Sequence, residues 1–122
     1  MTPWLTIQVC GFIFPIQVDE PHEYWRACRA ADFVNFWVSR QLRDARKASM
    51  DAVRTVVNLA AKALYRCKGL NVAGEVPSQY AESIVEQMGK EHPDLSEFNV
   101  LVISAVSIAF DFLSLWEKAS ET

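Results

Sequence analysis

The sequence predicts an α+β fold that is mostly α: an N-terminal β-hairpin followed by about four helices, the last one central and largely buried. Two patterns predict it. Apolar and polar residues alternate over the first 18 positions, as in short half-buried strands, whereas apolar residues recur every three or four positions along most of the remaining chain. Because 122 residues is the usual size of one domain, we expect a single domain over residues 1–122.

The hairpin is expected over residues 4–18. Leu5, Ile7 and Val9 alternate with more polar neighbours, a second alternating segment follows, and Gly11 lies where the chain must reverse. Two short strands are not stable alone. We therefore expect the hairpin to pack on a helix or on another copy of the chain.

Helical periodicity places the four helices at about 21–46, 50–68, 78–90 and 95–118. Pro21 suits a first helical turn, and the acidic residues around it complement the positive end of the helix. The apolar stripe of this helix faces the hairpin, so its additional aromatic residues need another surface, either a second helix of the same chain or a second subunit. For the next helix, Ser49 is the expected N-cap and Gly69 the C-terminal stop.

The last helix is apolar almost all round. Asp94, with Glu97 three residues later, predicts a capping box at its start. The apolar run 100–116 is shorter than the roughly 20 residues of a membrane span, so we expect a buried helix and no membrane span. A thin polar stripe remains on it, formed by Ser104, Ser107, Asp111, Ser114 and Lys118.

The cysteines and the N-terminus favour a cytoplasmic protein. Cys10, Cys28 and Cys67 are widely spaced and form no CxxC pair, so neither a disulfide framework nor a zinc cage is indicated. The N-terminus lacks the charged start and long apolar run of a signal peptide.

No pattern indicates catalysis. His22 and His92 belong to no HxxxH motif, and no glycine-rich phosphate loop is present, so we expect no metal, cofactor or small-molecule substrate. Asp111 is the one carboxylate inside the apolar run 100–116, but it shares the serine stripe and is interpreted as part of a narrow solvent face. We expect a protein that is not an enzyme; an enzyme that uses Asp111 or a cysteine is the minor alternative.

Charge is unevenly distributed along the chain. The net charge is −3, yet residues 40–68 carry eight basic and two acidic side chains. Such a segment can attract an acidic protein, and we predict that Arg40, Arg43, Arg46 and Lys47 bind one. A solvated basic face is the alternative. Nucleic acid is the weaker interpretation, because the pI is about 5.3 and no nucleic-acid-binding motif is present.

Apolar residues make up 51% of the chain, which is high for a small monomer and favours a homo-oligomer. The residues predicted at the oligomer interface are Trp25, Phe33, Trp37, Ser104, Ser107 and Phe110.

The hairpin segment resembles the ZapA family of bacterial cell-division proteins. The positions that carry the resemblance are Ile7, Val9, Gly11, Phe14, Ile16 and Val18 in the hairpin, followed by the Arg-Ala-Ala-x-x-Val-Asn segment 29–35. The resemblance implies an oligomer that binds the tubulin-like division protein FtsZ and cross-links its filaments. The long second helix of the family corresponds either to 51–64 or to 99–112.

Family members often have basic or polar residues at two hairpin positions that are Phe12 and Ile13 here, and the nearest substitutes are Arg40, Arg43 and Arg46. The functional expectation is thus a non-enzymatic, homo-oligomeric adaptor that binds an acidic protein, with FtsZ as the partner that the resemblance implies. The alternative is a small helical inhibitor, such as an immunity protein or a phage-encoded antagonist, that blocks a host or toxin protein.

Overall fold

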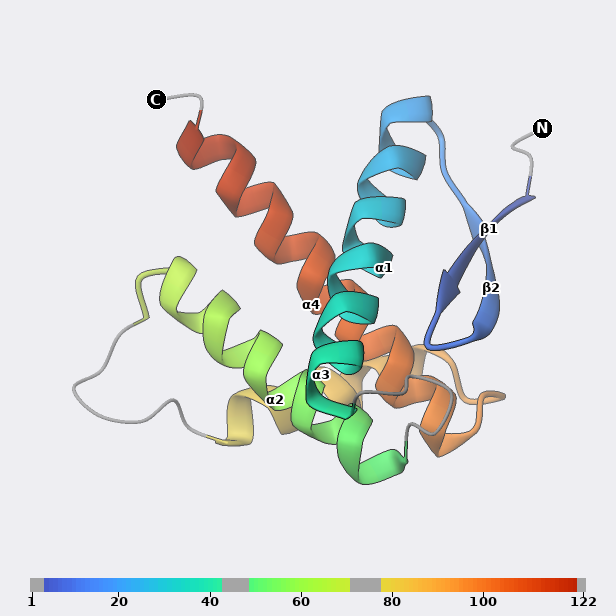
Figure 1. Ribbon diagram of the computed structural model, residues 1–122, viewed down its shortest axis with the longest axis vertical. Coiled ribbons are helices and arrows are strands. Elements are labelled where there is room, and N and C mark those ends of the chain that lie inside the picture. The colour runs from blue at the N-terminus through green and yellow to red at the C-terminus, as the bar shows by residue number, and fades with distance from the viewer. Residues whose placement is uncertain (1–3, 43–48, 71–77, 121–122) are drawn as a thin grey trace.

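A computed structural model describes residues 4–42, 49–70 and 78–120, and it confirms the predicted hairpin followed by four helices (Figure 1). The first predicted helix reached residue 46, but residues 43–48 lie outside the described part. The elements are β1 (Trp4–Val9), β2 (Phe12–Gln17), α1 (Pro21–Leu42), α2 (Met50–Cys67), α3 (Ser78–Glu91) and α4 (Glu97–Ser120).

The hairpin turns over two residues. β1 and β2 are antiparallel with Val9 opposite Phe12, so Cys10 and Gly11 form the turn. Both have positive φ, 52° and 83°, as a type I′ turn requires. Gly11 tolerates this conformation freely. Cys10 does not, and α1 holds it there: the Cys10 N–H donates to Asn35 Oδ1 at 2.7 Å, and Asn35 Nδ2 donates to the Gln8 carbonyl at 2.9 Å.

Side chains of α1 also cover the free edge of β1. The Tyr24 hydroxyl donates to the Thr6 carbonyl at 3.3 Å, next to the Asn35 bond to Gln8. Exposed strand edges invite pairing with other chains. On β2, Pro15 lies opposite Thr6. Counted from the turn, this is a non-hydrogen-bonded pair, in which the backbone groups point away from the partner strand. Proline has no N–H, but at this position no hydrogen bond between the strands is lost.

Helix α4 is the centre of the fold. It packs against α1, α2 and α3, and the hairpin packs on α1 (Figure 1). Small residues let the helices approach closely, since Ala105 and Ala109 of α4 are fully buried. One face of α2 is buried, mainly against α4, and this face is wider than the seam of a coiled coil. The buried residues of α2 are Val53, Val56, Val57, Ala60, Ala61 and Leu64.

The predicted boundaries of α2 are confirmed. Ser49 Oγ accepts the Ala52 N–H at 3.3 Å, and Gly69 follows the helix with a φ of 71°. The predicted capping box of α4 is wrong. Ser96 is the cap, because its Oγ accepts the Asn99 N–H at 3.2 Å, while Leu95 is held in the preceding turn by a bond from its N–H to the His92 carbonyl.

The apolar part of α4 is longer than the run 100–116 on which the expectation of no membrane span was based. Residues 97–119 form a helix long and apolar enough to cross a bilayer, with a mean hydropathy of 2.0 over its most apolar window. Length and composition do not decide the matter, because core helices of soluble proteins pass the same test. In this fold α4 packs centrally against three other helices.

Candidate functional site

Only one of the four predicted partner-binding residues can be placed. Arg43, Arg46 and Lys47 lie outside the described residues. Arg40 is exposed near the end of α1, and its guanidinium lies 5.6 Å from the centre of the Phe36 ring. This is the distance of a cation–π contact, so Arg40 and Phe36 present a cation and an aromatic ring together.

The predicted interface residues are dispersed. Ser104 is a correction: it is fully buried within the chain and its hydroxyl donates to the Val100 carbonyl at 2.7 Å, so it offers no surface to a second subunit. Its small side chain instead fits the tightly packed core of α4. Phe33 and Trp37 are half-buried. Phe33 stacks on Phe112 of α4 at 5.7 Å, with Trp37 edge-on to it at 6.0 Å.

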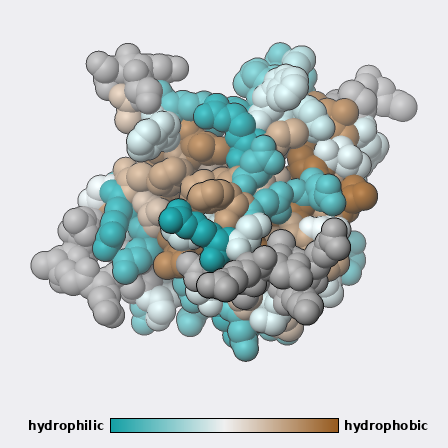
Figure 2. All heavy atoms as spheres, in the orientation of Figure 1, coloured by the Kyte–Doolittle hydropathy of each residue, from teal (hydrophilic) through white to brown (hydrophobic). Residues whose placement is uncertain are grey.

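For Phe33, the second surface is therefore α4 of the same chain. An ion pair also joins α1 to α4, because Arg29 Nη1 lies 2.9 Å from Glu117 Oε1. Figure 2 shows hydrophobic side chains gathered in the middle of the face where α1 and the second half of α4 diverge.

The outer face of α1 remains uncovered. Trp25 is 67% exposed and Phe36 58% exposed. They share one face of the helix, at three- and four-residue spacing, with three further exposed residues. We call this set the α1 stripe; it consists of Trp25, Arg29, Asp32, Phe36 and Arg40.

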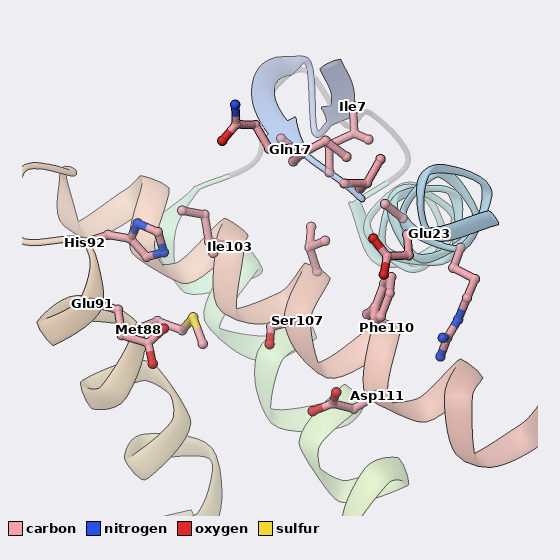
Figure 3. A pocket seen from close by; sticks show the side chains of 15 residues that line it. Ile7, Gln17, Glu23, Met88, Glu91, His92, Ile103, Ser107, Phe110 and Asp111 are labelled. Atoms are coloured by element: carbon pink, nitrogen blue, oxygen red, sulfur yellow. The ribbon is translucent and has the colours of Figure 1, made fainter. Parts of the chain in front are cut away.

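A groove of about 470 Å³ lies beside α4, and we call it the α4 groove (Figure 3). Its floor is a face of α4 with Ile103, Ser107 and Phe110, so two predicted interface residues, Ser107 and Phe110, are found here. One wall is the end of α3 with Met88, Glu91 and His92. The other is formed by the hairpin and the start of α1.

A smaller recess of about 200 Å³ adjoins the α4 groove beneath β2. The two share lining residues from the hairpin and α4, among them Ile7 and Ile103. The result is an open apolar depression that runs along the turns of α4 between the hairpin and α3.

Three carboxylates on the rim of the α4 groove lack a cationic partner among the described residues. Asp111 makes no hydrogen bond or ion pair there. Glu23 Oε2 accepts the backbone N–H of Asp19 at 2.9 Å, and Glu91 Oε1 accepts the Gln87 amide at 3.2 Å. Neither bond brings a cationic side chain to these carboxylates within the described part of the chain.

The arginine that lines the α4 groove is already engaged. The Arg26 guanidinium lies 4.7 Å from the centre of the Phe110 ring, and its Nε is 3.8 Å from Glu117 Oε2. That Nε is buried without a hydrogen-bond acceptor among the described residues. The rim is therefore negative around an apolar floor.

Within the three described ranges, no group of three His, Cys, Asp or Glu side chains could hold a metal ion. Asp111 is exposed, as the interpretation of a solvent face required. His22 is exposed as well, whereas His92 is half-buried in the groove wall. Burial raises the pKa of the Cys10 thiol, which makes that cysteine a poor nucleophile.

The α4 groove could not be recognised in the sequence because the hairpin and α1, which line one side, are distant in the chain from α3 and α4. The polar stripe on α4 was the only signal. Of its members, Ser107 and Asp111 line the groove, while Ser104 is buried in the core.

Comparisons with protein-family models, curated proteins and solved structures give no match to this chain. The ZapA resemblance therefore stays a prediction.

Proposed function

We propose that this protein is a non-enzymatic adaptor that self-associates and binds a protein partner. The observation that carries the proposal is the α1 stripe, on which Trp25 and Phe36 are more than half exposed. Single exposed apolar residues are ordinary. Here two large aromatic residues share one helix face with Arg29 and Arg40, and aromatic residues and arginine are the types enriched at protein interfaces.

The partner in this proposal is an acidic protein that binds the basic segment beginning at Arg40. The support is the excess of basic residues from 40 to 68. The ZapA resemblance of the hairpin and first helix names FtsZ as the partner to test. An oligomer with one weak site per subunit would bridge a filament by multivalency, because each additional contact forms at high effective concentration.

Light scattering of the purified protein tests self-association. We expect a mass above that of the 13.8 kDa monomer. The double variant Trp25→Ser/Phe36→Ser should lower that mass, because it removes both aromatic side chains of the α1 stripe. Trp4→Ser is the matched control, since Trp4 is 66% exposed on the hairpin and lies outside the stripe. A monomeric wild type would contradict self-association.

Sedimentation with polymerised FtsZ tests the partner. We expect co-pelleting and bundling at low salt that weaken as salt rises, because contacts between exposed charges are screened. The variant Arg43→Glu/Arg46→Glu, which leaves Arg40 unchanged, should pellet less than Lys90→Glu/Lys118→Glu, an equal charge reversal at exposed positions outside residues 40–68. Absence of co-pelleting at low salt would rule out the FtsZ role. A monomer that binds one host enzyme in a 1:1 complex would support the inhibitor alternative instead.

A further inference from the structure

Whether the copies associate through two equal faces or two different ones is a separate question, and it rests on the proposed self-association. In the simplest symmetric dimer, the α1 stripe would pack on a second α1 stripe across the two-fold axis. In a heterologous contact the stripe packs on a different surface of the next copy. The α4 groove is the candidate for that second surface.

We propose that the α1 stripe of one copy docks in the α4 groove of the next. The shapes are suited to each other, because a helix laid in a groove presents side chains at three- and four-residue spacing. Phe36 and Arg40 project from α1 at four-residue spacing, and the floor formed by Ile103, Ser107 and Phe110 is recessed between walls.

The α1 stripe is longer than the floor of the α4 groove. At 1.5 Å per residue, the distance along α1 from Trp25 to Phe36 is about 17 Å and that along the groove floor from Ile103 to Asp111 about 12 Å. The floor therefore accommodates about two turns of the stripe rather than all of it, and the turn that contains Phe36 and Arg40 is the one that we assign to it.

The charges are complementary at this end of the stripe. The Arg40 guanidinium lies over the Phe36 ring. In the proposed contact, the apolar ring and the cation therefore bind in the groove side by side. The floor of the α4 groove is apolar, and its rim carries Glu23, Glu91 and Asp111 without a cationic partner in the described ranges. A basic residue at the rim would supply the missing counter-charge.

The outer face of α2 is a poorer occupant. Its exposed residues are also basic, with Arg54, Lys62 and Arg66, but the residues between them, such as Asn58, are polar. That face has charge without an apolar stripe. The α1 stripe combines the two, and this is why we choose it over α2.

A contact between two different faces does not close on itself unless the rotation completes a ring. The proposal therefore predicts assemblies larger than dimers at high protein concentration. It also predicts complementation between two defective variants, which a contact of the α1 stripe with a second α1 stripe does not allow.

Two groove variants test the contact. Ser107→Trp places an indole ring on the floor of the groove. Asp111→Arg reverses a charge on its rim, at an exposed position where substitution should not destabilise the fold. We expect each to weaken self-association on the order of tenfold or more in sedimentation velocity. Asp94→Arg is the charge-matched control, because Asp94 is exposed and does not line the groove. Circular dichroism checks that each variant is folded.

The decisive measurement mixes the groove variant Asp111→Arg with the stripe variant Trp25→Ser/Phe36→Ser. Each alone should be mainly monomeric at a concentration at which the wild type associates. The mixture should form a 1:1 heterodimer and stop there, because the stripe variant contributes an intact groove, the groove variant contributes an intact stripe, and no further intact pair remains.

The other outcomes overturn the inference in distinguishable ways. If the folded groove variants associate as the wild type does, or if the mixture stays monomeric while the stripe variant alone is defective, the heterologous contact is wrong and the proposed self-association stands. If the wild type is monomeric at all concentrations, both proposals fail.

Discussion

A single side chain, Asn35, joins the hairpin to α1. Its amide accepts from the Cys10 N–H and donates to the Gln8 carbonyl, so it satisfies one donor and one acceptor of a turn whose first residue has positive φ. We expect Asn35→Ala to lower the free energy of unfolding by about 1–3 kcal/mol, because the partly buried Cys10 N–H loses its acceptor and the exposed Gln8 carbonyl loses its donor. Urea denaturation measures this. Asn58→Ala, at an exposed position on α2, is the control, and an equal effect of the two variants would contradict the role of Asn35.

Two glycines should respond to alanine with opposite signs. Gly11 has a φ of 83° and no neighbouring atom within 4 Å of the place that a methyl group would take, so Gly11→Ala costs only the left-handed conformation, about 1 kcal/mol. Gly89 lies inside α3, where the new methyl group would meet Val100 Cγ1 at an ordinary 3.9 Å. Gly89→Ala should therefore stabilise the protein, by about 0.5 kcal/mol. Thermal melting of both variants checks the signs, and the same sign for both would refute this account.

At the scale of elements, the start of α4 shows how a cap is chosen. The Ser96 hydroxyl, rather than the Asp94 carboxylate, accepts a hydrogen bond from the first turn. We expect Ser96→Ala to destabilise the protein by about 1 kcal/mol, and Asp94→Ala to change its stability by less than about 0.5 kcal/mol. Chemical denaturation compares the two. A larger loss from Asp94→Ala would restore the capping box that the sequence predicted.

The elements themselves could be predicted because their signals are local. The alternation of apolar and polar residues around Ile7 predicted the buried face of β1. Ser49 and Gly69 predicted the two ends of α2. Asp94 is not the cap, because Pro93 and the turn from His92 to Leu95 move the start of α4 two residues along the chain. Capping preferences of single residues do not predict such a turn.

At the scale of the whole molecule, tertiary packing decided what the sequence left open. The aromatic surplus of α1 was predicted to need a second surface, and α4 supplies it for Phe33 through Phe112, while Trp25 stays exposed. The serine stripe of α4 was predicted as one feature, yet Ser104 is in the core and Ser107 in the groove. Periodicity identifies a helix face but not the neighbour that covers it, so the α4 groove could not be predicted.

The hairpin has no independent stability in this fold, and its opening should require unfolding of the whole domain. Two strands do not persist alone, while Val9 is fully buried and Asn35 ties the turn to α1. Cys10 reports on this contact. It is buried, and burial raises the pKa of its thiol, so little thiolate is available to react in the folded protein. Cys67 is exposed and serves as an internal reference.

In a Cys28→Ser background, we expect a thiol reagent to modify Cys67 at once and Cys10 only through the unfolded state. The logarithm of the Cys10 labelling rate should then rise with urea along the same slope as global unfolding, provided that refolding outpaces the reagent. Mass spectrometry of the labelled protein separates the two sites. If Cys10 is instead labelled at a rate independent of urea, the hairpin opens by itself, and α1 then holds it more weakly than the Asn35 and Tyr24 hydrogen bonds imply.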